Sequence, residues 1–175
     1  MKATVRAMCE SDAAAFDYEY TLSGEVKSGE TFNTLYARQR LKKANVYVAE
    51  FEGKLLGYIV VSYETTVKGE VLVHIEDLFV LPLFRKCGVG KSILDYAERE
   101  IMRRYDKAHA SIGIGSKFGA AQRLFVKNGY IPDGMGARFN GRVLHDGAQA
   151  TNIRSLCLKY TKELKTLDNN NKNYH

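Results

Sequence analysis

The sequence predicts an α/β (α+β) fold built on a mixed, mostly antiparallel sheet, and two observations carry this prediction. Three strand-like stretches, 45–51, 54–63 and 70–80, follow one another at hairpin spacing, which is typical of an antiparallel meander. A glycine loop and an amphipathic helix then lead to a short strand at 109–115, and such a crossover joins parallel strands. We expect six to seven strands in one sheet.

Length and composition predict one globular domain with a polar tail. The chain has 175 residues, of which 45% are hydrophobic and 26% charged, values ordinary for a domain with its own core. The last nine residues, LDNNNKNYH, offer no packing face. We expect a single domain over residues 1–164 and a disordered tail over 165–175.

Charge and cysteine content limit the location and the partners. No apolar run approaches the ~20 residues of a membrane span, and the N-terminus lacks a signal-peptide pattern, so we expect a cytoplasmic protein without a membrane partner. The three cysteines have no metal-ligand spacing. The net charge of +6 suits a polyanionic ligand, but basic and aromatic residues form no patterned surface, which disfavours nucleic acid as a partner.

The N-terminal part predicts a strand and two helices beside the meander. Residues 2–8 alternate weakly as a strand, and Ser11 is a plausible N-cap for the first helix. After a polar loop at 22–30, the pattern of 31–43 predicts an amphipathic helix with Arg38 facing outward.

Turn and cap signals place the remaining elements. Glu52-Gly53 is a hairpin signal, and Gly129 stands where a helix C-cap needs a left-handed residue. The expected C-terminal elements are a helix at 120–128, turns at 131–136, a strand at 137–140, a loop at 141–147 and a strand at 155–160.

A glycine-spaced loop, Arg85-Lys86-Cys87-Gly88-Val89-Gly90, lies between the apolar strand and the next helix. The first amides of a helix lack intrahelical acceptors and the helix dipole adds positive potential, so this order of elements forms an anion site. Glycine lets the backbone approach a phosphate without an intervening side chain. The groups expected to bind a diphosphate are the amides of Gly88, Val89, Gly90, Lys91 and Ser92, with charge from Arg85, Lys86 or Lys91.

Two motifs in the sequence resemble those of the GNAT superfamily of N-acyltransferases. The string VLPLFRKCGVG at 80–90 is similar to the acyl-CoA signature R/Q-x-x-G-x-G/A, and AQRLFVKNGY at 121–130 resembles the second motif helix. The preceding IEDLFV at 75–80 is similar to the same strand in the diamine acetyltransferase branch. Together these motifs cover about a third of the chain in the order of the family.

The resemblance implies a fold, a co-substrate and a site. It implies helices on both faces of the sheet, central parallel strands that splay apart, and acetyl-CoA bound with its pantetheine in the gap. Dimers are common among relatives, so a homodimer is one state open to this chain. The site residues implied are Glu76 and Asp77 for catalysis and, for cofactor binding, Leu78, Phe79, Val80, Arg85, Lys86, Cys87, Gly88, Val89, Gly90, Lys91, Ser92 and Phe125, with no metal.

The acidic pair Glu76-Asp77 suits transfer to an amine. An amine of pKa about 10.4 is only about one part in a thousand neutral near pH 7, which adds ~4 kcal/mol to the barrier. A carboxylate that takes the proton directly or through water recovers part of this cost. Strict alternation places Glu76 and Asp77 on opposite faces of the strand, and a bulge would swap them. The diamine branch places its candidate base at the position of Glu76.

The sequence departs from the family at two positions. Phe125 stands where most relatives carry the tyrosine that protonates the leaving thiolate, and Phe118 replaces a frequent asparagine. Water, Tyr130 or Ser116 are the candidates for the missing acid.

The sequence leaves several acceptors and functions open. The acceptor is an amine of a polyamine, a small metabolite, an antibiotic or a protein. A binding module that holds acyl-CoA without efficient transfer is the main alternative. The phosphate loop of nucleotide hydrolases fits less well, because it needs glycine where Arg85 stands. A catalytic role for Cys87 lacks a histidine partner.

Overall fold

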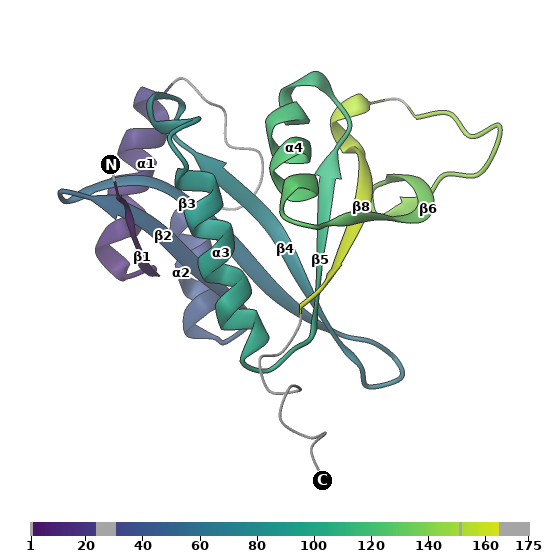
Figure 1. Cartoon of the computed structure of the whole chain (residues 1–175), viewed down its shortest axis with the longest axis horizontal. Helices are drawn as coiled ribbons and strands as arrows, with labels where there is room; N and C mark the ends of the chain where they lie inside the picture. The colour runs from purple at the N-terminus through teal and green to yellow at the C-terminus, as the bar shows by residue number, and fades with distance from the viewer. Residues whose placement is uncertain (1, 24–30, 151, 165–175) are drawn as a thin grey trace, which may run out of the picture. The chain divides into compact units, whose positions relative to one another are not determined.

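The computed structural model describes residues 2–23, 31–150 and 152–164. The predicted tail and most of the predicted loop at 22–30 lie outside these residues. Figure 1 traces the elements along the chain. The strands are β1 (Thr4–Ala7), β2 (Ala44–Phe51), β3 (Lys54–Thr65), β4 (Val71–Val80), β5 (Lys107–Gly113), β6 (Ile131–Phe139), β7 (Arg142–Val143) and β8 (Leu156–Glu163). The helices are α1 (Glu10–Leu22), α2 (Phe32–Arg40), α3 (Val89–Met102) and α4 (Gly119–Lys127).

The strands form a mixed, mostly antiparallel sheet in the order β1-β2-β3-β4-β5-β8-β6-β7, as the fold class predicted. The expected number of six to seven strands is wrong, because the described residues form a sheet of eight strands. The predicted turns at 131–136 belong to β6, in which Gly134 and Gly136 have positive φ and the register shifts between Pro132 and Ala137. Glycines that suggest turns in the sequence here form a bulge inside a strand.

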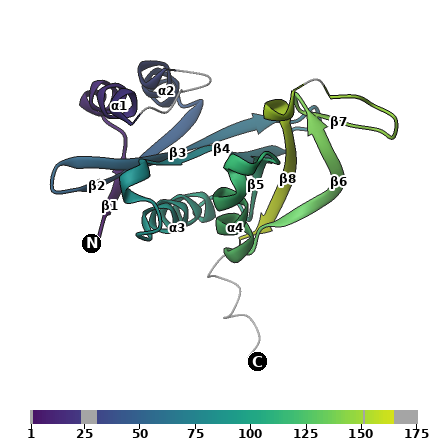
Figure 2. The same cartoon turned by 90° about the horizontal axis from the view of Figure 1, so that it is seen from above.

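The chain divides into two compact units. Unit 1 comprises Met1–Val71 and Ile75–Ala97, and unit 2 comprises Leu72–His74 and Glu98–His175. In unit 1, α1 and α2 lie on one side of β2 and β3, and α3 lies on the other side (Figure 2). Helices therefore cover both faces of this part of the sheet, as expected.

An aromatic cluster fills the layer between the sheet and the first two helices of unit 1. Phe16 of α1 stacks on Phe32 of α2 at 5.1 Å between ring centroids, and both rings meet Tyr58 of β3 edge-on. All three side chains are at most 1% exposed. Burial of each of these three aromatic side chains contributes about 2–3 kcal/mol to stability and holds the helices against the strands.

The start of α1 differs from the prediction. The N-cap is Cys9 rather than Ser11, because the carboxylate of Asp12 accepts the Cys9 amide at 2.8 Å. Arg6 of β1 donates to Asp12 at 2.6 Å and also to Glu50 of β2. Burial alone would raise the pKa of Asp12, but the hydrogen bonds from Arg6 and Cys9 lower it below its ordinary value. This network fastens α1 to the sheet edge.

The hairpin between β2 and β3 confirms the predicted turn. Glu52 and Gly53 have φ of 50° and 76°, as a two-residue loop with both central residues in the left-handed region requires.

Gly57 of β3 allows β4 to pass close by. A Cβ at this position would overlap the carbonyl oxygen of Phe79 and lie 3.1 Å from Cα of Val80. Because both neighbours are backbone atoms, they cannot rotate away.

Gly57→Ala is therefore expected to lower the free energy of unfolding by about 1–3 kcal/mol, the usual cost of overpacking. Chemical denaturation measures the change. Gly119→Ala is the matched control, since a Cβ there meets nothing within 4 Å, and its stability should stay at or slightly above that of the unchanged protein. Equal stability of the two variants would contradict the close approach of Phe79.

Unit 2 contains two neighbouring histidines, of which His109 is buried. His109 of β5 is 8% exposed and its ring centroid lies 5.4 Å from that of His74. Burial lowers the pKa of His109 from 6.5 to about 4, and the charge of Lys159 lowers it further in the same direction.

His109 is expected to make unit 2 sensitive to acid. Between about pH 6.5 and pH 4 the unfolded chain binds a proton at this residue and the folded chain does not, so stability falls as pH falls through this window, by up to roughly 3 kcal/mol. His109→Gln should flatten the dependence of unfolding free energy on pH. His145→Gln, at an exposed histidine, should leave it unchanged. An unaltered slope in His109→Gln would overturn the assignment.

Candidate functional site

The predicted anion loop directly follows β4 in unit 1. The Leu81 amide donates to Leu56 of β3 at 2.9 Å, which marks the last backbone bond between these strands before a 3₁₀ turn at Pro82–Phe84. Lys86 and Gly88 then have φ of 63° and 83°, and α3 begins at Val89. These two left-handed residues bring the helix N-terminus back to the end of β4.

The first amides of α3 suit an anion. Ser92 is the first residue whose amide returns to the loop, donating to the Gly88 carbonyl at 3.0 Å, and its hydroxyl donates to the same oxygen. The amides of Val89, Gly90 and Lys91 precede this bond, so they lack intrahelical acceptors. A Cβ at Gly88 would meet nothing within 4 Å, so the space in front of the loop is open. The Ser92 amide, in contrast to the prediction, is used within the helix.

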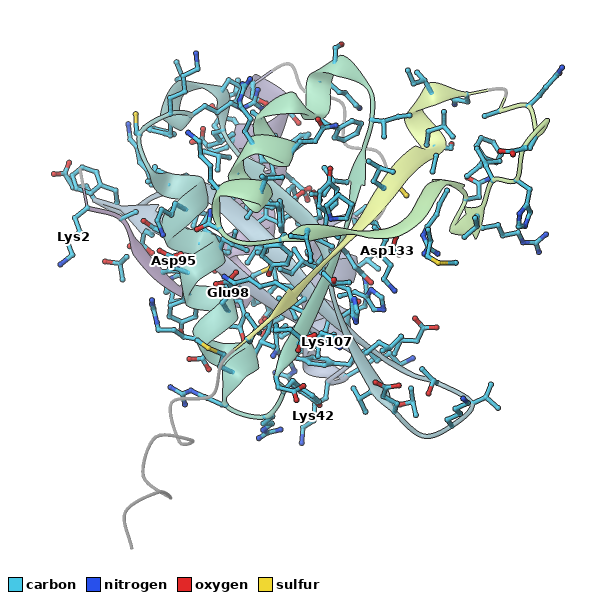
Figure 3. All side chains as sticks on the ribbon, turned by 45° about the vertical axis from the view of Figure 1, so that its right-hand side comes forward. Lys2, Lys42, Asp95, Glu98, Lys107 and Asp133 are labelled. Carbon is cyan, nitrogen blue, oxygen red and sulfur yellow. The ribbon has the colours of Figure 1, made fainter. Side chains whose placement is uncertain are left out.

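Arg85 and Lys91, two of the charged side chains at the loop and the start of α3, contact other residues of the protein. Arg85 donates from Nε to the Val80 carbonyl at 2.9 Å, and its guanidinium lies 5.5 Å from the Phe79 ring centroid. Lys91 pairs with Asp95 one turn along α3 at 2.7 Å; Figure 3 labels Asp95 on this helix. The exposed Cys87 thiol lies 3.5 Å from the Arg85 carbonyl. The backbone is therefore the part of the loop best placed to receive a diphosphate.

Glu76 is held by an arginine from α2. Arg38 donates from its two terminal nitrogens to the two carboxylate oxygens at 2.9 and 3.1 Å. The prediction that Arg38 faces outward is wrong, because the end of α2 lies over β4 and the guanidinium reaches the acid. Bidentate pairs of this kind are directional as well as attractive.

Asp77 accepts a hydrogen bond from Tyr58. The phenol oxygen lies 2.6 Å from Oδ2, and the Tyr58 side chain is 1% exposed. Burial raises the pKa of Tyr58 far above its ordinary value, and the negative charge of Asp77 raises it further. Tyr58 is therefore a permanent donor that fixes the orientation of Asp77.

Both acids point to the side of the sheet covered by α1 and α2. Glu76 meets Arg38 of α2, and Asp77 meets Tyr58, whose ring packs on both helices. Successive residues of a regular strand face opposite sides, so the prediction of opposite faces is wrong and β4 is irregular at this pair. The irregularity brings two carboxylates to one face.

The peptide that links Phe79 to Val80 lies against β3. Its carbonyl oxygen lies on the side of Gly57 where a Cβ would also meet Ile93 of α3. In a trans peptide the N–H points opposite to the carbonyl. The Val80 amide therefore points away from Gly57.

Unit 2 contains the remaining predicted residues. Phe125 is 3% exposed and packs edge-on against Tyr130 at 4.9 Å, so it serves the interior of this unit. Burial, followed by the charge of Glu98, raises the pKa of Tyr130 well above its ordinary value, which makes this phenol a poor acid. Ser116 is exposed, and the Phe118 ring lies against Gly113.

The predicted loop at 141–147 is partly a hairpin. β7 pairs with β6, and Arg138 pairs with Asp133 at 2.6 Å (Asp133 is labelled in Figure 3). The exposed His145 and Asp146 follow. Asp133 and Arg138 thus pair with each other, whereas His145 and Asp146 face solvent.

The described residues contain neither a helix that could span a membrane nor a group of side chains that could bind a metal ion. No helix between residues 2 and 164, within the described ranges, is long and apolar enough to cross a membrane. No group of three histidine, cysteine, aspartate or glutamate side chains in those ranges could hold a metal ion.

Comparison with known proteins agrees with this geometry. The family described as acetyltransferase (GNAT) domain matches residues 42–132. A protein of Archaeoglobus fulgidus named as an uncharacterized N-acetyltransferase is 30% identical over 124 residues, 70% of this chain and 80% of its own length.

Solved structures share the fold. Naa50 of Arabidopsis thaliana, in complex with the bisubstrate analogue CoA-Ac-MVNAL, has a TM-score of 0.66 at 14% identity, covering 94% of this chain and 100% of its own. The yncA protein of Salmonella typhimurium, with its cofactor acetyl-CoA, has a TM-score of 0.68 at 19% identity, covering 94% and 95%. The chain belongs to the GNAT superfamily of acetyltransferases.

Proposed function

We propose that this protein transfers an acetyl group from acetyl-CoA to a primary amine by direct attack of the bound amine on the thioester. The observation that carries the proposal is that two carboxylates, a backbone amide that points away from β3 and a helix N-terminus all lie along the single stretch from β4 to α3. Family membership supports acetyl transfer in general. The roles of individual residues are inferred from their geometry.

The diphosphate of the donor would bind the amides of Val89, Gly90 and Lys91. These groups lie at the positive end of the α3 dipole, and charge-assisted bonds to several amides at once add up to tight binding. Gly88 contributes by its positive φ and by the open space before it. Leu78 and Phe79 would lie along the pantetheine.

The Val80 amide would polarise the thioester carbonyl. A preorganised backbone donor aimed at the position where negative charge develops lowers the barrier by about 3 kcal/mol. The Val80 amide lies three residues after Asp77, so a carbonyl bound there would be close to the point where an incoming amine would arrive.

Glu76 and Asp77 would handle the proton of the amine. Arg38 fixes the position of the Glu76 carboxylate through both of its oxygens. Glu76 is our main candidate for the base, directly or through water, and Asp77 is the second. The two carboxylates would also attract the protonated amine before reaction.

The leaving thiolate would need no dedicated acid. A thiol of pKa about 8.5 leaves as an anion at a cost of about 2 kcal/mol near pH 7, which is less than the cost of deprotonating the amine. Phe125 in place of the usual tyrosine is compatible with such a route.

The acceptor is proposed to be a cationic amine, and two classes have support. The bisubstrate analogue bound by Naa50 ends in a peptide, which supports the amino terminus of a protein. The acidic pair resembles that of diamine acetyltransferases, which supports a polyamine.

A thiol-release assay with a panel of peptides and polyamines tests the proposal. Release of CoA that depends on one of these amines would support it. Binding of acetyl-CoA without release for any amine would favour the second candidate function, a module that holds acyl-CoA. This function is supported by Phe125 and Phe118, which stand where relatives carry a tyrosine and an asparagine.

A further inference from the structure

Arg85 begins the glycine loop but is attached to the end of β4. Its Nε donates to the Val80 carbonyl at 2.9 Å, and its guanidinium covers the Phe79 ring at 5.5 Å. The two contacts therefore lie on either side of the Phe79–Val80 peptide. Hydrogen bonds from charged donors are stronger than those between neutral groups, so this contact restricts the end of β4.

The contacts continue from Arg85 to the acids. The Phe79 ring packs on Tyr20 of α1 at 4.6 Å and on Tyr58 of β3 at 5.8 Å between centroids. Tyr58 in turn donates to Asp77 at 2.6 Å. Arg85 thus stands at one end of a contiguous row of packed and hydrogen-bonded side chains, and Asp77, the second candidate for the base, stands at the other.

We propose that Arg85 is a positioning residue for acetyl transfer, which holds the Val80 carbonyl and the Phe79 ring in the reactive geometry, and is not a ligand of the diphosphate. This inference rests on the proposed function. It reassigns the residue that the sequence motif places among the charged contacts to the cofactor. The Val80 carbonyl belongs to the peptide that follows Val80, so Arg85 holds the chain on both sides of the Val80 amide, at the Phe79 ring before it and at the Val80 carbonyl after it.

Binding and turnover separate the two roles. A diphosphate ligand contributes to the affinity for free CoA, whereas a positioning residue acts on the chemical step. Gln supplies a side-chain N–H donor without a positive charge, and Met supplies neither. The informative pair of variants is therefore Arg85→Met and Arg85→Gln, each in the full chain.

Calorimetry with CoA and the rate of thiol release at saturating substrates give the test. Arg85→Met is expected to lower kcat about 10–100-fold while Kd for CoA changes less than about threefold, and Arg85→Gln should regain most of kcat. Arg103→Met, at a side chain that is 73% exposed, is the control and should change neither quantity.

Results that contradict the role of Arg85 differ from those that contradict the proposed function. An increase of about tenfold or more in Kd for CoA with kcat retained, or an unchanged kcat in Arg85→Met, would overturn the positioning role and leave the proposed function standing. The same holds if Arg85→Gln is as slow as Arg85→Met. Absence of amine-dependent turnover in the unchanged protein would instead remove the proposed function itself.

Discussion

Gly88→Glu is expected to abolish measurable binding of CoA. Gly88 has φ of 83°, which costs a residue with a Cβ about 1–2 kcal/mol. The new carboxylate would also extend into the open space before the loop, where the diphosphate is expected, and like charges a few Å apart repel by about 1–4 kcal/mol. Together these terms, about 2–6 kcal/mol, predict a loss of affinity of at least about thirtyfold, measured by calorimetry.

A control separates charge from backbone strain. Gly53→Glu changes another left-handed glycine, at φ of 76°, in the distant β2–β3 turn. We expect Gly53→Glu to lose stability and keep its affinity for CoA. Full retention of CoA by a folded Gly88→Glu protein would contradict the assignment of the loop.

Glu76→Gln is expected to give the second large effect, a fall of kcat/KM by about 10²–10³ near pH 7. Without this carboxylate the enzyme would use only the small fraction of amine that is already neutral. The rate of the variant should therefore keep rising, about tenfold per pH unit, toward the pKa of the amine near 10.4. The positive charge of Arg38 would no longer be balanced by the negative charge of Glu76, and it would repel a cationic acceptor. This repulsion should raise KM for the amine.

The pH–rate profile decides between the two acids. Asp77→Asn, compared under the same conditions, should show a smaller loss and a profile of unchanged shape. Glu70→Gln, at an exposed acid just before β4, is the control and should match the unchanged protein. A wild-type profile for Glu76→Gln together with the steep profile for Asp77→Asn would move the base to Asp77.

Local signals predicted the backbone part of the site. The glycine spacing placed the start of α3 within the predicted loop, and Glu52-Gly53 gave the hairpin at its correct position. Both features depend on φ angles that only a few residue types adopt readily, so the sequence reports them directly.

Contacts between distant parts of the chain could not be predicted in this way. Arg38 lies 38 positions before Glu76, and Tyr58 lies 19 positions before Asp77. Helical periodicity assigned Arg38 to the solvent face, because the pattern does not show that a long side chain can reach back to a strand. The irregularity at Glu76 and Asp77 likewise leaves no mark on the alternation of residue types.

The glycines at 134 and 136 are local signals that led to a wrong prediction of turns. Glycine is typical of turns and of bulges alike, and only the pairing of β6 with β8 distinguishes the two. This ambiguity made the predicted strand at 137–140 shorter than β6, and the additional strand of the sheet is the two-residue β7.

Calorimetric titration of the folded protein with CoA and with acetyl-CoA tests the central claim most directly. The expected result is saturable binding of both at one site, weakened in Gly88→Glu and retained in Glu76→Gln. Absence of heat with either compound, on protein whose circular dichroism confirms that it is folded, would contradict the claim that the end of β4 and the start of α3 bind a thioester of CoA.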